Sequence, residues 1–371
     1  MIYIFTQYFT PAFKAGGPIT SITNILSKVE GDFKVVARGH DLNDSKPLEV
    51  KLNCWTNSSK NWYVSNGISA ILSFYKELIK QQQHIFYING LFDWKLNLLP
   101  ILCGKKIIIA PRGMLQKGAL SNGSVKKGFY LAVLRVLLRG KDLKWHATDE
   151  VEAADIKLLF GKQEVTVIPN LIKQVQGVEM QSKKQVGHLN IVYYSLLSEK
   201  KNLLFLLRLL ESSNGSFQLH VYGPDKDPVY AEKCKQMVRS SATLASKVMF
   251  QGALFPTEFE RLAHQFDYFV LPTLGENYGH AIVESLALGL PVFISDKTPW
   301  FFDEISFSYS LGLHSEQQWI DTLNQLYDMD AITHLKAKTE AVSFYQNQIE
   351  SEQDKYIELY KNIFFTSNKS E

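Results

Sequence analysis

The sequence has few cysteines and no apolar run long enough to cross a membrane. Cys54, Cys103 and Cys234 lie far apart and form no CxxC pair, so neither a disulfide framework nor a thiolate zinc site is suggested. No apolar run approaches the roughly 18 residues that a membrane span requires. The N-terminal stretch MIYIFTQYFTPAF lacks a basic region and a small-residue cleavage site. We therefore expect a cytoplasmic protein that is at most associated with a membrane surface.

The sequence also lacks the glycine fingerprint GxGxxG, which weakens a dinucleotide dehydrogenase interpretation. The net charge is only +3 over 371 residues, but it is unevenly spread. Residues 1–170 hold 22 Lys and Arg against 13 Asp and Glu, a net charge of +9, and the remaining residues have a net charge of −6. The first half of the chain is therefore a basic region.

Short apolar runs alternate with helical patterns along the chain, which is typical of a parallel α/β architecture. A length of 371 residues exceeds the usual size of one hydrophobic core. We predict two doubly wound domains, 1–172 and 189–345, joined by a polar linker, 173–188, and followed by a C-terminal helix in 346–371. The predicted strands are MIYIF, FKVVA, HIFYING and KKIIIAPRG in the first domain, and LNIVYYS, FQLHVYG, KVMFQG, FDYFVLP and LPVFISD in the second.

The segment GENYGHAIVESLALGLPVF, residues 275–293, follows one of these strands and places two glutamates in an otherwise apolar stretch. Helix signals begin near Tyr278 and end at Gly289, so Glu276 precedes the helix and Glu284 lies inside it. The free N–H groups at the start of a helix suit a phosphate, and a carboxylate can accept hydrogen bonds from a vicinal diol. Alternatively, Glu276 caps the helix and Glu284 is an exposed helix charge.

The E-x7-E spacing of ENYGHAIVE, followed by SLALGLPVF, resembles the signature of retaining glycosyltransferases of family four. The resemblance implies the GT-B fold, in which two Rossmann-like domains face a cleft that holds a nucleotide sugar and a C-terminal helix crosses back to the N-terminal domain. It also implies that Glu276 contacts the transferred sugar and that Glu284 holds the ribose. Backbone N–H groups near Asn277, Tyr278 and Gly279 would bind the diphosphate.

Motifs in the first half of the chain resemble the same family. Gly16 and Gly17, in YFTPAFKAGGPITSI, follow the first strand, where glycine allows close backbone approach to a phosphate or sugar; an ordinary strand-to-helix turn is the alternative. The order APRGML, HATDEVEAADI and VIPN resembles a bacterial polysaccharide-forming branch. Many relatives carry histidine at the position of Arg112. Arg112 cannot act as a base but can hold a phosphate or polarise an oxygen; the alternative is a surface arginine in a tight turn.

The segment VYYSLLSEKKNLLFLLRLL resembles a family pattern whose arginine and lysine neutralise the leaving diphosphate. Lys201 matches the lysine, but Leu196 occupies the arginine position. The loss of one cation should weaken the grip on the donor unless Lys200, Arg112 or another base replaces it. A protein that binds the donor without transferring it is therefore an alternative.

Two shorter patterns lie at the ends of predicted strands. GAL, which contains Gly252 and Leu254, resembles the family turn whose backbone contacts the nucleobase, and such recognition does not separate uracil from guanine. PDKD contains a D-x-D pattern at residues 225–227 that in another glycosyltransferase fold binds a divalent metal. GT-B enzymes need no metal there, so we expect a turn beside the nucleotide, with no metal and no cofactor.

The segment Val125 to Trp145 combines apolar residues at helical spacing with a rim of basic side chains: Lys126, Lys127, Arg135, Arg139, Lys141 and Lys144. A helix of this kind can lie on an anionic membrane surface. The alternative is a core helix with basic ends. The net charge of +9 in this half favours membrane contact.

These motifs predict a retaining glycosyltransferase of the hexosyl or N-acetylhexosaminyl type, with Lys201, Glu276 and Arg112 as catalytic residues. The expected donor is a UDP- or GDP-sugar bound by the C-terminal domain. The expected acceptor is a hydroxyl of a glycan, lipid-linked and destined for a surface polysaccharide such as lipopolysaccharide or capsule, bound by the N-terminal domain. No nucleic-acid partner is expected. The alternatives are a non-catalytic nucleotide-sugar-binding subunit and a sugar-nucleotide epimerase of related fold.

Overall fold

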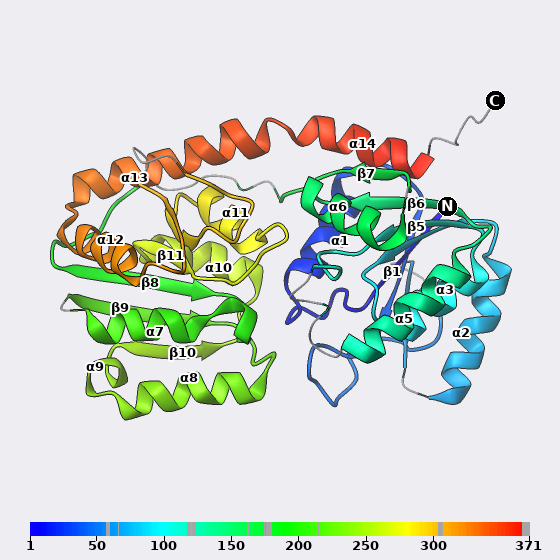
Figure 1. Ribbon diagram of the computed structural model, residues 1–371, viewed down its shortest axis with the longest axis horizontal. Coiled ribbons are helices and arrows are strands. Elements are labelled where there is room, and N and C mark those ends of the chain that lie inside the picture. The colour runs from blue at the N-terminus through cyan, green and yellow to red at the C-terminus, as the bar shows by residue number, and fades with distance from the viewer. Residues whose placement is uncertain are drawn as a thin grey trace. The chain divides into compact units, whose positions relative to one another are not determined.

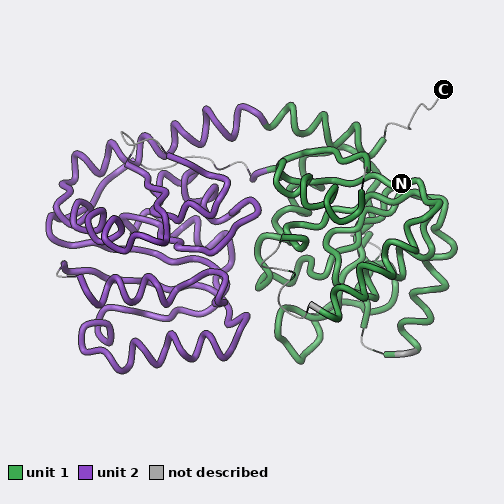
Figure 2. The backbone as a smooth tube through the Cα atoms, in the orientation of Figure 1, with its two compact units in different colours: residues 1–171, 353–371 green, residues 172–352 purple. Residues whose placement is uncertain are grey.

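The chain folds into two compact units, each built around one parallel β-sheet (Figures 1 and 2). Unit 1 comprises residues 1–171 and 353–371, and unit 2 comprises residues 172–352. The predicted linker thus falls in unit 2, and its residues 174 and 176–179 lie outside the described part of the chain. The computed structural model describes residues 1–56, 60–65, 67–116, 120, 124–161, 163–173, 175, 180–213, 215–302 and 307–365.

The sheet of unit 1 has the strand order β3-β2-β1-β4-β5-β6-β7, with all neighbours parallel. Its strands are β1 (Ile2–Thr6), β2 (Phe33–Arg38), β3 (Asn61–Val64), β4 (Ile85–Asn89), β5 (Lys106–Ala110), β6 (Asp142–Ala147) and β7 (Val165–Val167). All residues of β1, IYIFT, are buried. A parallel sheet is covered on both faces, which explains why its strands appear as continuous apolar runs in the sequence.

Helices cover both faces of this sheet. They are α1 (Gly17–Lys28), α2 (Ile68–Lys80), α3 (Leu99–Cys103), α5 (Ser124–Leu137), α6 (Glu150–Phe160) and α14 (Gln353–Phe365). Ile4 belongs to the same apolar cluster as Ile22 of α1 and Phe364 of α14, whereas Phe5 belongs to the cluster that contains Leu134 of α5. This alternation is that of a β-strand between two helical layers. The C-terminal helix is therefore part of the core of unit 1.

The sheet of unit 2 has the order β10-β9-β8-β11-β12-β13, again with parallel neighbours. Its strands are β8 (His188–Tyr194), β9 (Ser216–Tyr222), β10 (Val248–Gly252), β11 (Tyr268–Leu271), β12 (Val292–Ser295) and β13 (Tyr309–Leu311). Its α-helices are α7 (Leu203–Ser212), α8 (Pro228–Ser240), α9 (Ala242–Ala245), α10 (Pro256–Leu262), α11 (His280–Ala287), α12 (Glu316–Asp328) and α13 (Ala331–Phe344). In both units the first six strands have the order 3-2-1-4-5-6 of doubly wound folds.

The structure confirms the predicted strands and the end of helix α11, and it corrects one helix. Gly289 has a φ of 67° directly after α11, as a C-terminal glycine should. The helix predicted for Val125 to Trp145 is wrong in its second half, because α5 ends at Leu137 and Asp142–Ala147 form strand β6. Trp145 is fully buried there, so the part of the basic rim beyond α5 does not belong to an amphipathic helix. No described helix has the length and apolar character of a membrane span.

Candidate functional site

The strand order of unit 2 places a topological switch point between β8 and β11. These strands are neighbours in the centre of the sheet, and the chain leaves them toward opposite edges of the strand order. In open α/β sheets, ligands bind outside the carboxyl ends of the strands at such a point. The loops after β8 and β11 carry Lys201 and Glu276, so the two residues predicted from separate motifs meet at this position.

Hydrogen bonds hold the two loops together. The backbone N–H of Leu274 donates to the carbonyl oxygen of Lys200 at 2.7 Å, and the hydroxyl of Thr273 donates to the same oxygen at 3.0 Å. Lys201 ends a short 3₁₀ turn, Glu199–Lys201, and Asn202 follows with a φ of 57° before α7 begins. These backbone contacts therefore hold the loop of Lys200 and Lys201 against the loop after β11, at the carboxyl ends of the strands.

The ammonium group of Lys201 forms an ion pair with the carboxylate of Glu276. The two side chains are only 16% and 12% exposed, so the pair is largely withdrawn from water. Burial, together with the neighbouring ammonium groups of Lys200 and Lys226, lowers the pKa of Lys201 to about 7. The carboxylate of Glu276 acts in the opposite direction and favours the charged ammonium. An anionic ligand beside Lys201 would favour the charged form as well.

Helix α11 begins at His280. Gly279 directly precedes the helix and has a φ of 77°. A side chain at this glycine would strain the backbone and lie 2.9 Å from Cδ1 of Ile282. The Oδ1 atom of Asn277 is buried and has no hydrogen-bond partner in the described part of the protein. An unpaired buried acceptor costs free energy unless a ligand or water donates to it. Asn277, Tyr278 and Gly279 are therefore the residues directly before the helix N-terminus, and their role toward the diphosphate stays a prediction.

Glu284 lies in α11 and is half-buried. Burial and the carboxylate of Glu260 raise the pKa of Glu284 to about 7, while the ammonium of Lys173 opposes the rise. Lys173 itself forms an ion pair with Glu260 at 2.5 Å. Among the described residues, no ion pair or hydrogen bond engages the Glu284 carboxylate. Glu284 is therefore a half-buried acid rather than the exposed helix charge of the alternative, and its role toward the ribose stays a prediction.

The predicted base-contacting turn lies at the carboxyl end of β10. Gly252 ends that strand with a φ of 79°, and its carbonyl oxygen accepts a hydrogen bond of 2.7 Å from the N–H of Gly223. Leu254 is half-buried against the core of unit 2. Both residues lie at the carboxyl ends of the strands, as Lys201 and Glu276 do. Their role toward the donor stays a prediction.

In unit 1, Gly16 and Gly17 occupy the expected position after β1. Gly16 has a φ of 62° and precedes α1, which begins at Gly17. A Cβ atom at Gly16 would meet no atom within 4 Å, so glycine is required there by the backbone angle rather than by crowding within the unit. The positive φ explains the glycine without a ligand, and a role in donor binding stays a prediction.

Arg112 lies in a buried polar network of unit 1. Its φ is 57°, in the left-handed region. Nε donates to Oδ1 of Asn89, Nη1 donates to Oδ1 of Asn170, and Nη2 donates to the hydroxyl of Tyr87, each at 2.7 Å. Tyr87 and Asn89 belong to β4, and Asn170 follows β7. The guanidinium thus ties three segments of unit 1 together, which is a structural role that the surface-turn alternative did not foresee. Its predicted role in catalysis is not tested by this geometry.

The network continues to His146, the fully buried histidine of the HATDEVEAADI motif. Its Nε2 lies 2.8 Å from the carbonyl oxygen of Ile168, which can only accept, so Nε2 carries the proton. Nδ1 then accepts a hydrogen bond of 2.8 Å from the hydroxyl of Tyr87. Burial and the charge of Arg112 lower the pKa of His146 to about 3. Tyr360 of α14 packs edge-on against this ring at 5.2 Å, so the C-terminal helix closes the network.

Two polar residues of the site were not identified from the sequence. Glu152 is buried and accepts hydrogen bonds from the N–H of Gly113 at 2.6 Å and from the N–H and hydroxyl of Thr148 at 2.8 Å. Glu152 holds the turn that contains Arg112. Its place in the HATDEVEAADI motif was the signal available in the sequence. Lys226 contributes to the charge around Lys201. It was overlooked because the D-x-D pattern drew attention to the aspartates on either side.

Comparisons with known proteins bear on this site. Residues 188–327, within unit 2, match the family described as glycosyl transferases group 1. No curated protein gives a significant match.

Solved structures resemble the fold over nearly the whole chain. A sucrose-phosphate synthase from Thermosynechococcus elongatus has a TM-score of 0.73 at 15% identity, covering 99% of both chains. HepE from Anabaena in complex with UDP and glucose has a TM-score of 0.71 at 13% identity, covering 97% of this chain and 99% of that one. WaaG, a glycosyltransferase involved in lipopolysaccharide biosynthesis, has a TM-score of 0.70 at 13% identity, covering 99% and 100%. The chain therefore has the predicted GT-B fold.

Proposed function

We propose that this protein is a retaining glycosyltransferase that moves a hexosyl or N-acetylhexosaminyl group from a nucleotide diphosphate sugar to a hydroxyl of a glycan. The observation that carries the proposal is the Lys201–Glu276 ion pair, which joins the loops after β8 and β11 at the switch point. Glu284 follows within the same segment as a half-buried acid without an ion-pair partner in the described residues. The match of residues 188–327 to glycosyl transferases group 1 covers all three residues.

Each group has a chemical task in the proposed reaction. The bond between the anomeric carbon and the diphosphate oxygen breaks, and the anomeric carbon bonds to the acceptor oxygen. Lys201 and the N–H groups before α11 stabilise the charge that develops on the leaving diphosphate. Glu276 orients the sugar, and Glu284 accepts hydrogen bonds from the ribose hydroxyls. The leaving phosphate takes the proton of the acceptor hydroxyl on the same face, so no covalent enzyme intermediate and no metal or other cofactor are required.

The structural relatives support the proposed donor and acceptor classes. HepE binds UDP and glucose, and WaaG acts in lipopolysaccharide biosynthesis. We therefore infer a UDP- or GDP-sugar as donor and a glycan, lipid-linked and destined for a surface polysaccharide, as acceptor. The residues at the nucleobase turn, Gly252 and Leu254, present backbone groups to either base.

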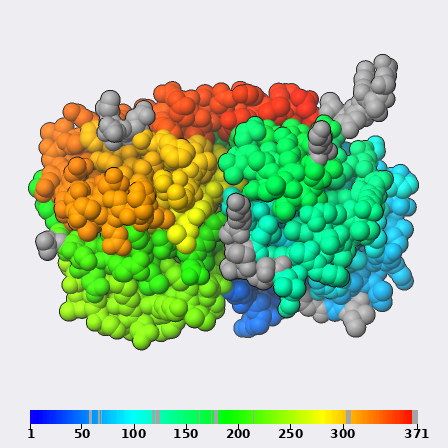
Figure 3. Space-filling model, in the orientation of Figure 1, coloured from blue at the N-terminus to red at the C-terminus, as the bar shows by residue number. Residues whose placement is uncertain are grey.

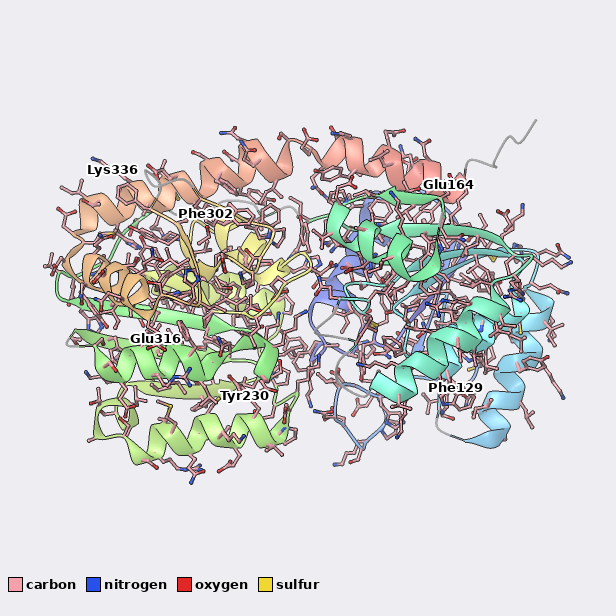
Figure 4. The ribbon with its side chains drawn as sticks, viewed as in Figure 1. Phe129, Glu164, Tyr230, Phe302, Glu316 and Lys336 are labelled. Carbon is pink, nitrogen blue, oxygen red and sulfur yellow. The ribbon has the colours of Figure 1, made fainter. Side chains whose placement is uncertain are left out.

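Helix α5 is the part of the predicted membrane segment that still supports a peripheral contact with the cytoplasmic face of an anionic membrane. Val125, Phe129 and Val136 are 85%, 73% and 59% exposed, and α5 lies on the face of unit 1 shown in Figure 3, with Phe129 labelled in Figure 4. The helix and the turn after it also carry exposed basic residues, Lys126, Arg135 and Arg139. Apolar side chains between cations suit an anionic bilayer.

Sedimentation with vesicles that contain phosphatidylglycerol tests this contact. We expect Phe129→Glu to reduce the bound fraction severalfold, because it removes an apolar contact and adds a repelled charge. Leu158→Glu, at an equally exposed residue of α6, is the control. Equal binding of both variants and the wild type would contradict the membrane role.

The donor assignment is tested by a thermal-shift screen over UDP, GDP and their sugars, followed by measurement of free nucleotide diphosphate released with the best ligand. Stabilisation by one nucleotide is expected, since a ligand that binds only the folded state raises the melting temperature. If no nucleotide binds, the donor site is wrong. Leu196, at the position of the second family cation, keeps one alternative open: binding without release would indicate a non-catalytic subunit. Conversion of the donor without an acceptor would indicate an epimerase.

A further inference from the structure

Three lysines gather at the carboxyl ends of two neighbouring strands of unit 2, next to the switch point. Lys200 and Lys201 follow β8, and Lys226 follows β9. Lys201 forms an ion pair with Glu276. These basic residues stand out because the sequence from residue 171 onward is negatively charged overall.

Backbone hydrogen bonds place Lys226 beside the loop that follows β8. The N–H of Leu197 donates to the carbonyl oxygen of Pro224, and the N–H of Asp227 donates to the carbonyl oxygen of Leu197, both at 3.0 Å. Leu197 makes both bonds, and its two partners flank residues 225 and 226, so the backbone of Lys226 lies beside Leu197, the residue after Leu196. Lys226 is thus held next to the residue that stands at the expected arginine position.

Gly223 allows this close approach. Its φ is 148°, and a Cβ atom there would lie 1.8 Å from the backbone oxygen of Ser195. No side chain fits at that distance, because the obstacle is backbone and cannot move without breaking the sheet edge. The contact between the loops after β8 and β9 therefore depends on glycine at position 223.

The electrostatic behaviour of the lysines agrees with a shared site. The charges of Lys200 and Lys226 both lower the pKa of Lys201, and the charge of Lys200 lowers the pKa of Lys226 in addition to the effect of burial. Like charges this close destabilise one another. A multiply charged anion would relieve the repulsion, so the arrangement favours ligand binding over stability of the free protein.

We propose that Lys226 supplies the second cation for the donor diphosphate, in the place that Leu196 leaves without charge. The inference rests on the proposed function and identifies a further binding residue for it. The side chain of Lys226 is exposed to solvent, while the protein around its ammonium partly desolvates that group and lowers its pKa. The ammonium can therefore reach a ligand at the carboxyl ends of β8 and β9. Lys201 holds the same diphosphate from the side of Glu276.

The aspartates on either side of Lys226 have other tasks. Asp227 caps helix α8 by accepting hydrogen bonds of 3.1 Å from the N–H groups of Val229 and Tyr230. Asp225 forms an ion pair of 2.7 Å with Lys235. Their carboxylates are thus engaged within the loop and helix that carry Lys226.

Isothermal titration with inorganic pyrophosphate, UDP and UMP tests the proposal. We expect Lys226→Ala to weaken pyrophosphate and UDP binding about tenfold and UMP binding much less, because the lost cation faces the diphosphate. Lys226→Arg should retain affinity. Lys233→Ala, which removes an exposed charge from α8, is the matched control and should bind as the wild type does. In Lys226→Ala, the added substitution Leu196→Arg should restore most of the lost affinity.

The outcomes separate this inference from the proposed function. Pyrophosphate binding that Lys226→Ala leaves within twofold of the wild type would overturn the inference, and so would equal losses for UDP and UMP. A wild-type protein that binds pyrophosphate but neither UDP nor GDP would refute the transferase, whereas a selective loss in Lys226→Ala would still support the anion site. UDP binding with a loss confined to the diphosphate supports both.

Discussion

The two units share a strand order but use the carboxyl ends of their strands differently. In unit 1, the guanidinium of Arg112 donates to Asn89, Asn170 and Tyr87, and the network ends at a backbone carbonyl through His146. In unit 2, Lys201 pairs with Glu276 at the carboxyl ends of the strands, and the ammonium groups of Lys200 and Lys226 lower its pKa. The carboxyl ends of unit 1 thus carry a hydrogen-bonded network around one cation, whereas those of unit 2 gather several cations.

This difference leads us to expect that the carboxyl ends of the strands serve stability in unit 1 and ligand binding in unit 2. A buried hydrogen-bonded network rigidifies the unit that contains it. Crowded like charges cost stability, and a fold retains them where they serve binding. The contrast supports the proposed roles of Lys201 and Glu276, and for Arg112 it favours a structural role.

The largest expected effect comes from removing the central cation of unit 2. We expect Lys201→Ala to lower kcat about 100- to 1000-fold, because the leaving diphosphate loses a cation that stabilises its developing charge. The melting temperature should fall as well, because the carboxylate of Glu276 loses its partner in a largely buried ion pair, although the loss of repulsion among the lysines offsets part of this cost; activity is therefore compared at a temperature where both proteins are folded. The measurement is steady-state release of nucleotide diphosphate beside a melting curve.

Lys336→Ala, at an exposed position of α13 labelled in Figure 4, is the control and should keep full activity. A loss of activity below tenfold in Lys201→Ala would show that the charged edge of unit 2 does not carry the reaction. In that case the contrast between the two edges would no longer indicate where catalysis occurs.

In unit 1, the expected effect of Arg112→Ala is on stability. We expect the free energy of unfolding to fall by about 3 kcal/mol, because the substitution leaves buried acceptors on Asn89, Asn170 and Tyr87 without their donor. Urea denaturation measures the change. Arg135→Ala, which removes an exposed arginine that donates to the carbonyl oxygen of Leu159 and lies over the ring of Phe160, should cost less than about 1 kcal/mol.

The opposite pattern would reverse the comparison. If Arg112→Ala unfolds at the wild-type urea concentration but loses activity, the guanidinium serves the reaction as the sequence motif predicted. If both stability and activity are retained, the network is not a stabilising element of unit 1.

The fold was predictable from the sequence because its main signals are local. Most strands of the two parallel sheets are short apolar runs, and glycines such as Gly161 and Gly289 end helices where the backbone needs a positive φ. Strand β6 was not predicted, because its sequence DLKWHA continues the spacing of the basic helix before it. The strand forms because pairing with β5 buries Trp145.

The site was predictable only where its chemistry lies within one segment. Glu276 and Glu284 share a loop and a helix, so their spacing carried the signal. The partners of Arg112 come from segments up to 58 residues away, and only the sheet order brings them together. The same holds for Lys226, whose position beside Leu196 depends on the loop contact at Gly223.

The smallest expected effect concerns Glu284 and the pH dependence of stability in unit 2. Its pKa is about 7 in the folded protein against an ordinary value of 4.5, so the folded state binds more protons than the unfolded state between these pH values. The free energy of unfolding should therefore fall as pH rises from about 4.5 to 7. Glu284→Gln removes this contribution, and at pH 7 the variant should exceed the wild type by about 1–2 kcal/mol, a value reduced for partial exposure. Urea denaturation across the range measures the difference, with Glu316→Gln at an exposed helix end as control. If the free energies of unfolding of the wild type and Glu284→Gln change with pH in parallel, the carboxylate is ionised throughout this range. Unit 2 would then hold one destabilised charge fewer than its contrast with unit 1 requires.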